Sequence, residues 1–154
     1  MSEPLRYRFR VGCPAERAFK LWTESAGVWW PMATHSVSGR RDSVLVIEPG
    51  PGGRVYERTA SGREFSWGTV VEWEPARRLV CEWLVGDTPT ELEVRFAPDA
   101  EGGTVVEVEH RGWERFGKAG RDHRDLNDRG WSRVIARYVA ACRPGPSRGR
   151  GGGR

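Results

Sequence analysis

Residues 65–85 read FSWGTVVEWEPARRLVCEWLV, and this stretch contains two runs in which large apolar side chains alternate with other residues. The apolar face of the first run would consist of Phe65, Trp67, Thr69, Val71 and Trp73, and that of the second run of Leu79, Cys81, Trp83 and Val85. A period of two is typical of a β-strand with one buried face. The segment 74–77, which contains Pro75, separates the runs and indicates a turn. The stretch therefore predicts two neighbouring antiparallel strands that carry their tryptophans on one shared face.

The same alternation continues on both sides of this pair. Strands are expected at 44–48 and 54–59 around a Gly-Pro-rich turn, and again at 92–96 and 106–111. A further strand is expected at the N-terminus, where apolar residues alternate with arginines: Leu5, Tyr7, Phe9 and Val11. Turn residues recur regularly from 43 to 111, which is typical of an antiparallel meander.

Helical spacing appears in three other segments. Ala15, Ala18 and Trp22 recur on one side of a short helix that follows Pro14, and residues 24–31 predict a second short helix. An apolar stripe near the C-terminus predicts a helix of about 20 residues, about 30 Å long. The stripe contains Leu126 or Asn127, then Gly130, Trp131, Val134, Ile135, Tyr138 and Ala141. Pro144 ends this helix, because its ring clashes with the preceding turn.

Together these elements predict one α+β domain over residues 1–142. A curved seven-stranded antiparallel sheet would wrap around the long C-terminal helix, with two short helices after the first strand. One helix cannot fill the concave side of such a sheet, so we expect an apolar cavity between them. Residues 143–154 are rich in Arg, Gly and Pro and predict a disordered tail.

Composition and charge argue against several classes of function. The net charge of +4 comes from four arginines of the tail, because residues 1–142 hold equal numbers of acidic and basic side chains. A neutral domain with a short basic tail predicts no specific nucleic-acid partner. No apolar run approaches the roughly 18 residues of a membrane span, and no signal segment precedes the first strand. We therefore expect a cytoplasmic protein, monomeric or weakly dimeric, with no membrane partner.

The cysteines and histidines do not indicate a metal site. Cys13, Cys81 and Cys142 are widely spaced, and the three histidines share no ligand spacing on a single element. Reduced, buried thiols are expected, with no metal and no cofactor.

Two polar residues are expected on the inner face of the sheet. His110 continues the alternation of Val106 and Val108, and Glu57 has the same parity as Val55. A histidine and a carboxylate in a pocket of low water content could act as an acid–base pair, or could orient a ligand through hydrogen bonds. His35, in the loop after the short helices, is expected at the mouth of the pocket.

The tryptophans are the other candidate site residues. Trp67, Trp73 and Trp83 share the inner face of adjacent strands, and Trp131 would face them from the long helix beside Gly130. Rings that converge in this way would form an aromatic cage for a flat apolar ligand.

Several segments resemble the START-like (SRPBCC, Bet v 1-like) superfamily, and most closely the bacterial homologues of the activator of heat-shock protein 90 ATPase. These segments follow one another in the order 29–31, 48–58, 67–75, 110–114 and 130–131, and the resemblance extends over residues 5–141. It implies the helix-grip fold. Members of the superfamily carry lipids, steroids, polyketides and plant hormones, and some are cyclases or hydrolases.

The leading functional prediction is the binding of a small hydrophobic molecule, lipid-, polyketide- or aromatic-like, in the internal cavity. The residues expected to bind it are Trp30, His35, Glu57, Trp67, Trp83, His110 and Trp131. One alternative is a cyclase or hydrolase that acts on a polyketide-like substrate through His110 and Glu57. The other is a protein-interaction module of the chaperone-regulator type, which a cavity filled with side chains would favour.

Overall fold

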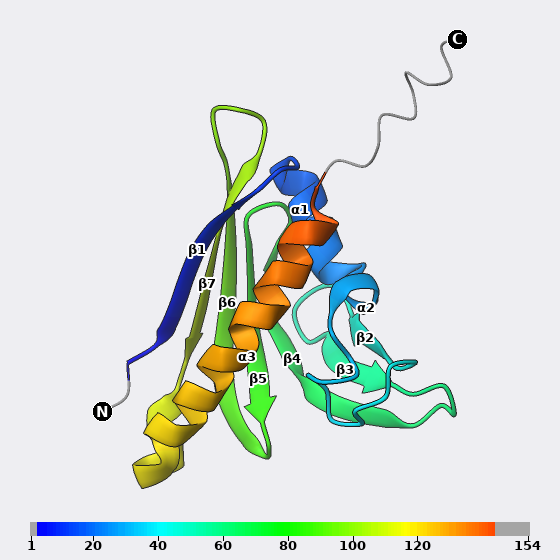
Figure 1. The fold of residues 1–154 in the computed structure, drawn as a ribbon, viewed down its shortest axis with the longest axis vertical. Coiled ribbons are helices and arrows are strands. Elements are labelled where there is room, and N and C mark those ends of the chain that lie inside the picture. The colour runs from blue at the N-terminus through cyan, green and yellow to red at the C-terminus, as the bar shows by residue number, and fades with distance from the viewer. Residues whose placement is uncertain (1–2, 144–154) are drawn as a thin grey trace.

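Seven antiparallel strands form a single curled sheet within residues 3–143, the part of the chain that the computed structural model describes (Figure 1). The strands are β1 (Leu5–Val11), β2 (Val44–Ile47), β3 (Arg54–Arg58), β4 (Glu64–Glu74), β5 (Arg78–Val85), β6 (Thr88–Pro98) and β7 (Thr104–Arg111). Their order across the sheet is β1-β7-β6-β5-β4-β3-β2. The predicted meander is confirmed, because β2 to β6 each pair with the strand that follows in sequence and β1 pairs with β7.

The helices lie on the concave side of the sheet. Two short helices, α1 (Ala15–Thr23) and α2 (Ala26–Trp29), follow β1, and the long helix α3 (Gly120–Ala141) crosses the sheet diagonally (Figure 1). A 3-10 segment, η1 (Trp113–Ala119), joins β7 to α3 and was not expected from the sequence. The helix-grip arrangement is thus confirmed. The predicted tail lies outside the described residues, apart from Arg143.

Plain alternation fails in the middle of β4. Two register shifts interrupt the pairing of this strand. In the pairing with β3, Trp67 has no partner, because Ser66 pairs with Tyr56 and Gly68 pairs with Val55. In the pairing with β5, Val71 has no partner. Each shift is a β-bulge, which changes the parity of the strand by one residue. The two changes cancel, so that Phe65 before the bulges and Trp73 after them lie on the same inner face, as expected, and Trp67, the unpaired residue of the first bulge, is buried on that face as well.

Between the two bulges, the sequence-based prediction was wrong. Thr69 pairs with Arg54 and Glu82, both exposed, and Val71 is exposed on the outer face. Val70 is buried instead. The prediction failed because a bulge adds one residue to the strand without adding one to its partner.

Gly68 explains why β4 bulges beside Trp67. Its φ is +144°, and a Cβ at this position would lie 1.8 Å from the carbonyl oxygen of Glu82 on β5. Only glycine allows the two backbones to approach this closely. The bulge keeps the indole of Trp67 on the concave face.

The core lies between the sheet and the three helices. Tyr138 of α3 is fully buried, and its hydroxyl donates a hydrogen bond to the carbonyl of Ala18 at 2.6 Å, which ties α3 to α1. The cysteines are free and buried, as expected. On α3, Leu126 is exposed and Asn127 is half-buried, so that Asn127 belongs to the inner stripe of the helix and Leu126 does not.

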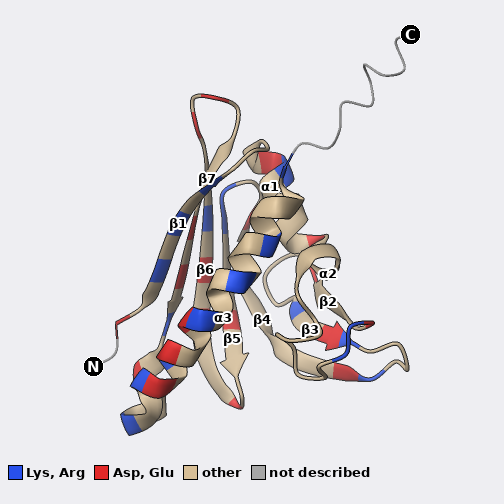
Figure 2. Cartoon of the chain, in the orientation of Figure 1, with Lys and Arg blue, Asp and Glu red and all other residues tan. Residues whose placement is uncertain are grey.

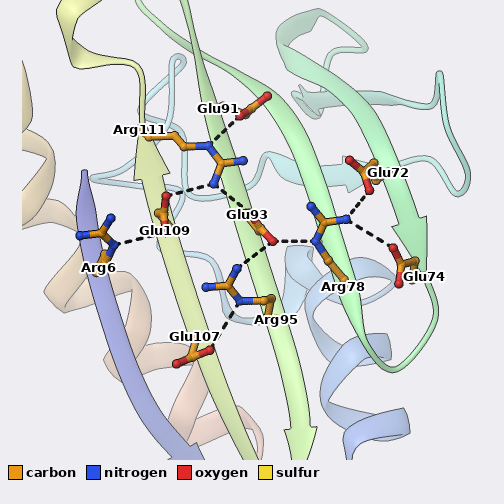
Figure 3. Close-up of polar contacts among 10 residues, drawn as sticks. All are labelled: Arg6, Glu72, Glu74, Arg78, Glu91, Glu93, Arg95, Glu107, Glu109 and Arg111. Carbon is orange, nitrogen blue, oxygen red and sulfur yellow. Dashed lines mark hydrogen bonds and ion pairs between the residues drawn. The ribbon is translucent and has the colours of Figure 1, made fainter. Parts of the chain in front are cut away.

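Basic and acidic residues are interspersed along the strands (Figure 2), and on the convex face of the sheet they form a lattice of ion pairs (Figure 3). Glu93, at the centre, is only 5% exposed and accepts hydrogen bonds from Arg78, Arg95 and Arg111 at 2.6, 3.1 and 2.8 Å. Burial alone would raise the pKa of this carboxyl, but the hydrogen bonds and charges of these arginines hold it below its ordinary value. The arginines and glutamates of β5, β6 and β7 therefore form the solvated outer face of the sheet.

Candidate ligand-binding site

A cavity of about 730 Å³ lies between the concave face of the sheet, α3 and the loop that follows α2. This volume is within the range of small-molecule sites, roughly 300–1,000 Å³. Its wall is formed by Trp30, Thr34, His35, Ser36, Val37, Glu64, Phe65, Ser66, Trp67, Trp83, Leu84, Val85, Gly86, Asp87, Asn127, Gly130, Trp131 and Val134. The cavity occupies the position that the sequence predicted for it.

Four tryptophans of the described residues surround the cavity. Trp67 and Trp83 come from neighbouring strands, Trp30 from the end of α2, and Trp131 from α3. The centroid of the Trp30 ring lies 5.3 Å from that of Trp67, 5.8 Å from Trp83 and 5.9 Å from Trp131. Tilted and edge-to-face contacts at such distances are favourable between aromatic rings, so the four indoles support one another.

His110 is fully buried behind Trp131. Its Nδ1 accepts a hydrogen bond from the indole nitrogen of Trp131 at 3.0 Å, and its Nε2 lies 2.7 Å from the hydroxyl of Thr90. That hydroxyl also donates to the carbonyl of Trp83 at 2.6 Å. A continuous hydrogen-bonded chain therefore links Trp131 on the helix to Trp83 on β5.

The hydrogen-bond donors around His110 determine its tautomer. An indole N–H can only donate, so Nδ1 of His110 must carry its lone pair toward Trp131. The proton of the neutral ring is then on Nε2 and is donated to Thr90. Burial lowers the pKa of His110 from 6.5 to about 3, which agrees with a neutral ring.

Glu57 is also fully buried, at the other end of the aromatic group. Its Oε1 accepts hydrogen bonds from the backbone N–H of Val37 at 2.6 Å and from the indole of Trp67 at 2.9 Å. Its Oε2 accepts one from the N–H of Ser38 at 3.2 Å. The carboxylate thus joins the loop after α2 to the wall of the cavity.

His35 lies in that loop and lines the cavity. Its carbonyl accepts a hydrogen bond from the indole of Trp30 at 2.8 Å, and its Nδ1 lies 2.6 Å from the hydroxyl of Thr34. A Cβ on Gly130 would lie 3.3 Å from the imidazole, so the glycine allows this ring to pack on α3. Burial and the charge of Arg133 lower the pKa of His35.

The expectation that His110 and Glu57 face the cavity was wrong. Both point to the concave side, but neither is part of the cavity wall, and each contacts a different tryptophan. They are not brought together as an acid–base pair. The alternation of a strand shows which face a side chain is on, but not whether another side chain covers it. In this protein the indoles of Trp131 and Trp67 lie against these two groups.

The cavity also contains residues that sequence reasoning did not assign to it. The sequence predicts Phe65 on the inner face and gives Asn127 as one of two alternatives for the helical stripe, but it assigns neither to the site. Sequence reasoning missed wall residues in the loop after α2, at the end of β5 and in the turn that follows β5, because these positions are not part of an inward-facing pattern: Thr34, Ser36, Val37, Leu84, Gly86 and Asp87.

No group of three or more His, Cys, Asp or Glu side chains within residues 3–143 could hold a metal ion. Over the same residues, no helix is long and apolar enough to cross a membrane.

A curled antiparallel sheet that encloses a long C-terminal helix, with a cavity between the two, defines a helix-grip protein of the START-like superfamily. Residues 12–141 match the model of the family described as Activator of Hsp90 ATPase homolog 1-like protein. The chain belongs to this family. A comparison with curated proteins gave no match.

Solved structures with the same fold include an anthrahydroquino-gamma-pyrone synthase, Txn09, complexed with SUM. It is 30% identical in sequence, with a TM-score of 0.63 over 90% of this chain and 96% of that one. A self-sacrificing resistance protein, CalC from Micromonospora echinospora, is 24% identical, with a TM-score of 0.67 over 91% of this chain and 94% of that one. Protein MLL2253 from Mesorhizobium loti is 15% identical, with a TM-score of 0.65 over 90% and 95% of the two chains. The last two similarities concern the fold alone.

Proposed function

We propose that this protein binds a flat, apolar small molecule in the cavity between its sheet and α3. The observation that carries the proposal is the set of four indoles around a volume of about 730 Å³. The four indoles are buried to all but 4–7% of their surface, and a bound ring would cover the apolar surface that stays open to the cavity. Nine of the eighteen wall residues are aromatic or aliphatic and seven have polar side chains, so the wall offers apolar surface together with groups that can orient a ligand.

His110 and Glu57 have a positioning role in this proposal. Each holds the N–H of one cavity tryptophan, so that the indole rings are oriented before a ligand arrives. Pre-organised side chains lose less conformational entropy on binding, which increases affinity.

The alternative of a protein-interaction module receives less support. The cavity is not filled by side chains, and the large exposed hydrophobic residues of the described chain belong to different elements: Val28, Val37, Val44, Val71 and Leu126.

A pair of valine substitutions tests the proposal. Val85 lines the cavity, whereas Val71 is exposed on the outer face of the sheet. We expect Val85→Phe to occupy part of the cavity and to weaken the binding of fluorene, a flat tricyclic hydrocarbon, by about tenfold or more, whereas Val71→Phe leaves it unchanged. Isothermal titration calorimetry measures both affinities. Equal weakening by both variants, or no binding by the wild type, would contradict the proposal.

A second candidate is ring closure in a polyketide-like substrate. It is supported by the 30% identity to the anthrahydroquino-gamma-pyrone synthase. His110 is not the base that we assign to such a reaction, because both ring nitrogens are engaged, one by Trp131 and one by Thr90. Polar groups at the cavity wall include His35, Asn127 and Ser66. Mass spectrometry of an incubation with an aromatic poly-β-ketone would detect loss of water on cyclisation, and His35→Ala should slow it if His35 takes part.

A further inference from the structure

The hydrogen bonds of the cavity tryptophans are not equivalent. The indole N–H groups of Trp30, Trp67 and Trp131 each donate to an acceptor of the protein, at 2.8, 2.9 and 3.0 Å. An indole nitrogen donates one hydrogen bond and accepts none, so these three groups are satisfied. They have no donor left to offer to a ligand.

Trp83 differs from the other three. Within residues 3–143, no acceptor bonds to its Nε1, although the side chain is only 7% exposed. Over the same residues, no fully buried side-chain nitrogen or oxygen lacks a hydrogen-bond partner. The Nε1 atom of Trp83 must therefore be reachable from solvent. The ring contacts those of Trp30, Trp67 and Trp131 and lines the cavity, so this N–H is accessible from the cavity.

The cavity wall favours a neutral acceptor for this N–H. It contains no lysine or arginine among the described residues, whereas Glu64 and Asp87 contribute carboxylates at exposed positions. Glu64 is itself ion-paired with Arg54 and Arg58, at 3.0 and 3.2 Å, so an anionic ligand would find no free cation among the described residues of the wall and would lose its hydration on entry. A carbonyl oxygen on a flat ring system meets the same N–H without that cost.

We infer that the ligand is a flat aromatic carbonyl compound, such as a polycyclic ketone or quinone, and that Trp83 Nε1 donates a hydrogen bond to its carbonyl oxygen. This inference rests on the proposed function, because it assigns a chemical class to the ligand of the same cavity. Within residues 3–143, Trp83 has the only free N–H among the four cavity indoles, and this donor selects among flat ligands. An apolar ring without an oxygen leaves the donor unpaired, and an unpaired polar group away from water is costly.

Fluorenone and fluorene test the inference, because they are flat tricycles of nearly the same shape and only fluorenone has a carbonyl. Trp83→Phe removes the free N–H and keeps an aromatic face. We expect this variant to lose about 3- to 10-fold more affinity for fluorenone than for fluorene. Trp30→Phe is the matched control, because it removes an N–H that already donates to His35. We expect it to weaken both probes by the same factor.

The carbonyl stretching band of bound fluorenone gives a second measurement that does not depend on a variant. A hydrogen bond from Trp83 shifts this band to lower frequency in the wild-type complex, relative to fluorenone in cyclohexane. An unshifted band, or a ratio of affinities that Trp83→Phe leaves unchanged, would overturn the inference while the binding of both probes still supported the proposed function. If neither probe bound the wild type, the proposed function itself would fail.

Discussion

Replacing His110 by glutamine tests whether this buried histidine is a neutral positioning group. Glutamine has an amide oxygen that can accept from Trp131 and an amide NH₂ that can donate to Thr90, so it reproduces both hydrogen bonds of the neutral ring. It does not titrate. The variant therefore separates the hydrogen bonds of His110 from its protonation.

The magnitude follows from the pKa of about 3, which burial lowers from 6.5. Below pH 6.5 the unfolded chain protonates this ring and the folded protein does not, so the unfolded state binds more protons. The stability that the neutral ring contributes is fully present above pH 6.5 and is lost as the pH falls toward about 3. Each pH unit in this window removes up to about 1.4 kcal/mol, or about 2.5 kcal/mol at pH 4.5.

Glutamine avoids this loss. We expect His110→Gln to be less stable than the wild type by about 1 kcal/mol at pH 7, because its hydrogen bonds are less well aligned. At pH 4.5 we expect it to be more stable than the wild type by about 1–2 kcal/mol, which follows from the linkage above. The order of stability of the two proteins should therefore reverse within this pH range.

Urea unfolding, followed by circular dichroism at several pH values between 7 and 4.5, measures the difference. His35→Gln is a useful comparison, because burial and Arg133 also lower the pKa of His35 but its ring is only half-buried, so a smaller effect is expected. Parallel pH profiles for the wild type and His110→Gln would refute the neutral, buried histidine. A loss of stability above 3 kcal/mol at pH 7 would show that glutamine does not reproduce its hydrogen bonds.

Three further predictions concern the sheet and the loop. Gly68→Ala should destabilise the fold by about 3 kcal/mol in urea unfolding, because its Cβ would meet the carbonyl of Glu82 at 1.8 Å; a variant as stable as the wild type would contradict the bulge. Glu57→Gln should cost about 1–3 kcal/mol and should accelerate hydrogen exchange at the Val37 amide, because it places an NH₂ among donors; unchanged exchange would show that the carboxylate does not hold the loop. Glu93→Gln should cost about 1–2 kcal/mol, less at high salt, because a nearly buried charge among three arginines is lost; a salt-independent cost would point to packing instead.

The sequence by itself determined the topology and the ingredients of the cavity. A period of two from residue 43 to residue 111 and a helical stripe near the C-terminus were sufficient to predict one sheet and one long helix that covers it. The inward positions of Trp67, Trp83 and Trp131 followed from the same periods, because a buried face must be apolar all along an element. The presence of a cavity followed from the small volume of one helix against seven strands.

Tertiary structure decided which inward residues reach the cavity. His110 and Glu57 have the inward parity that the sequence predicted, but Trp131 and Trp67 hydrogen-bond to them and line the cavity in their place. The two bulges of β4 and the loop amides that bind Glu57 also depend on contacts between residues far apart in the chain. The periodicity of a segment shows which face of its own helix or strand a side chain occupies. The side chain that covers it belongs to another element, so the periodicity does not reveal it. The N–H of Trp83, which has no acceptor within residues 3–143, is such a property, because only the fold decides which groups lie near it.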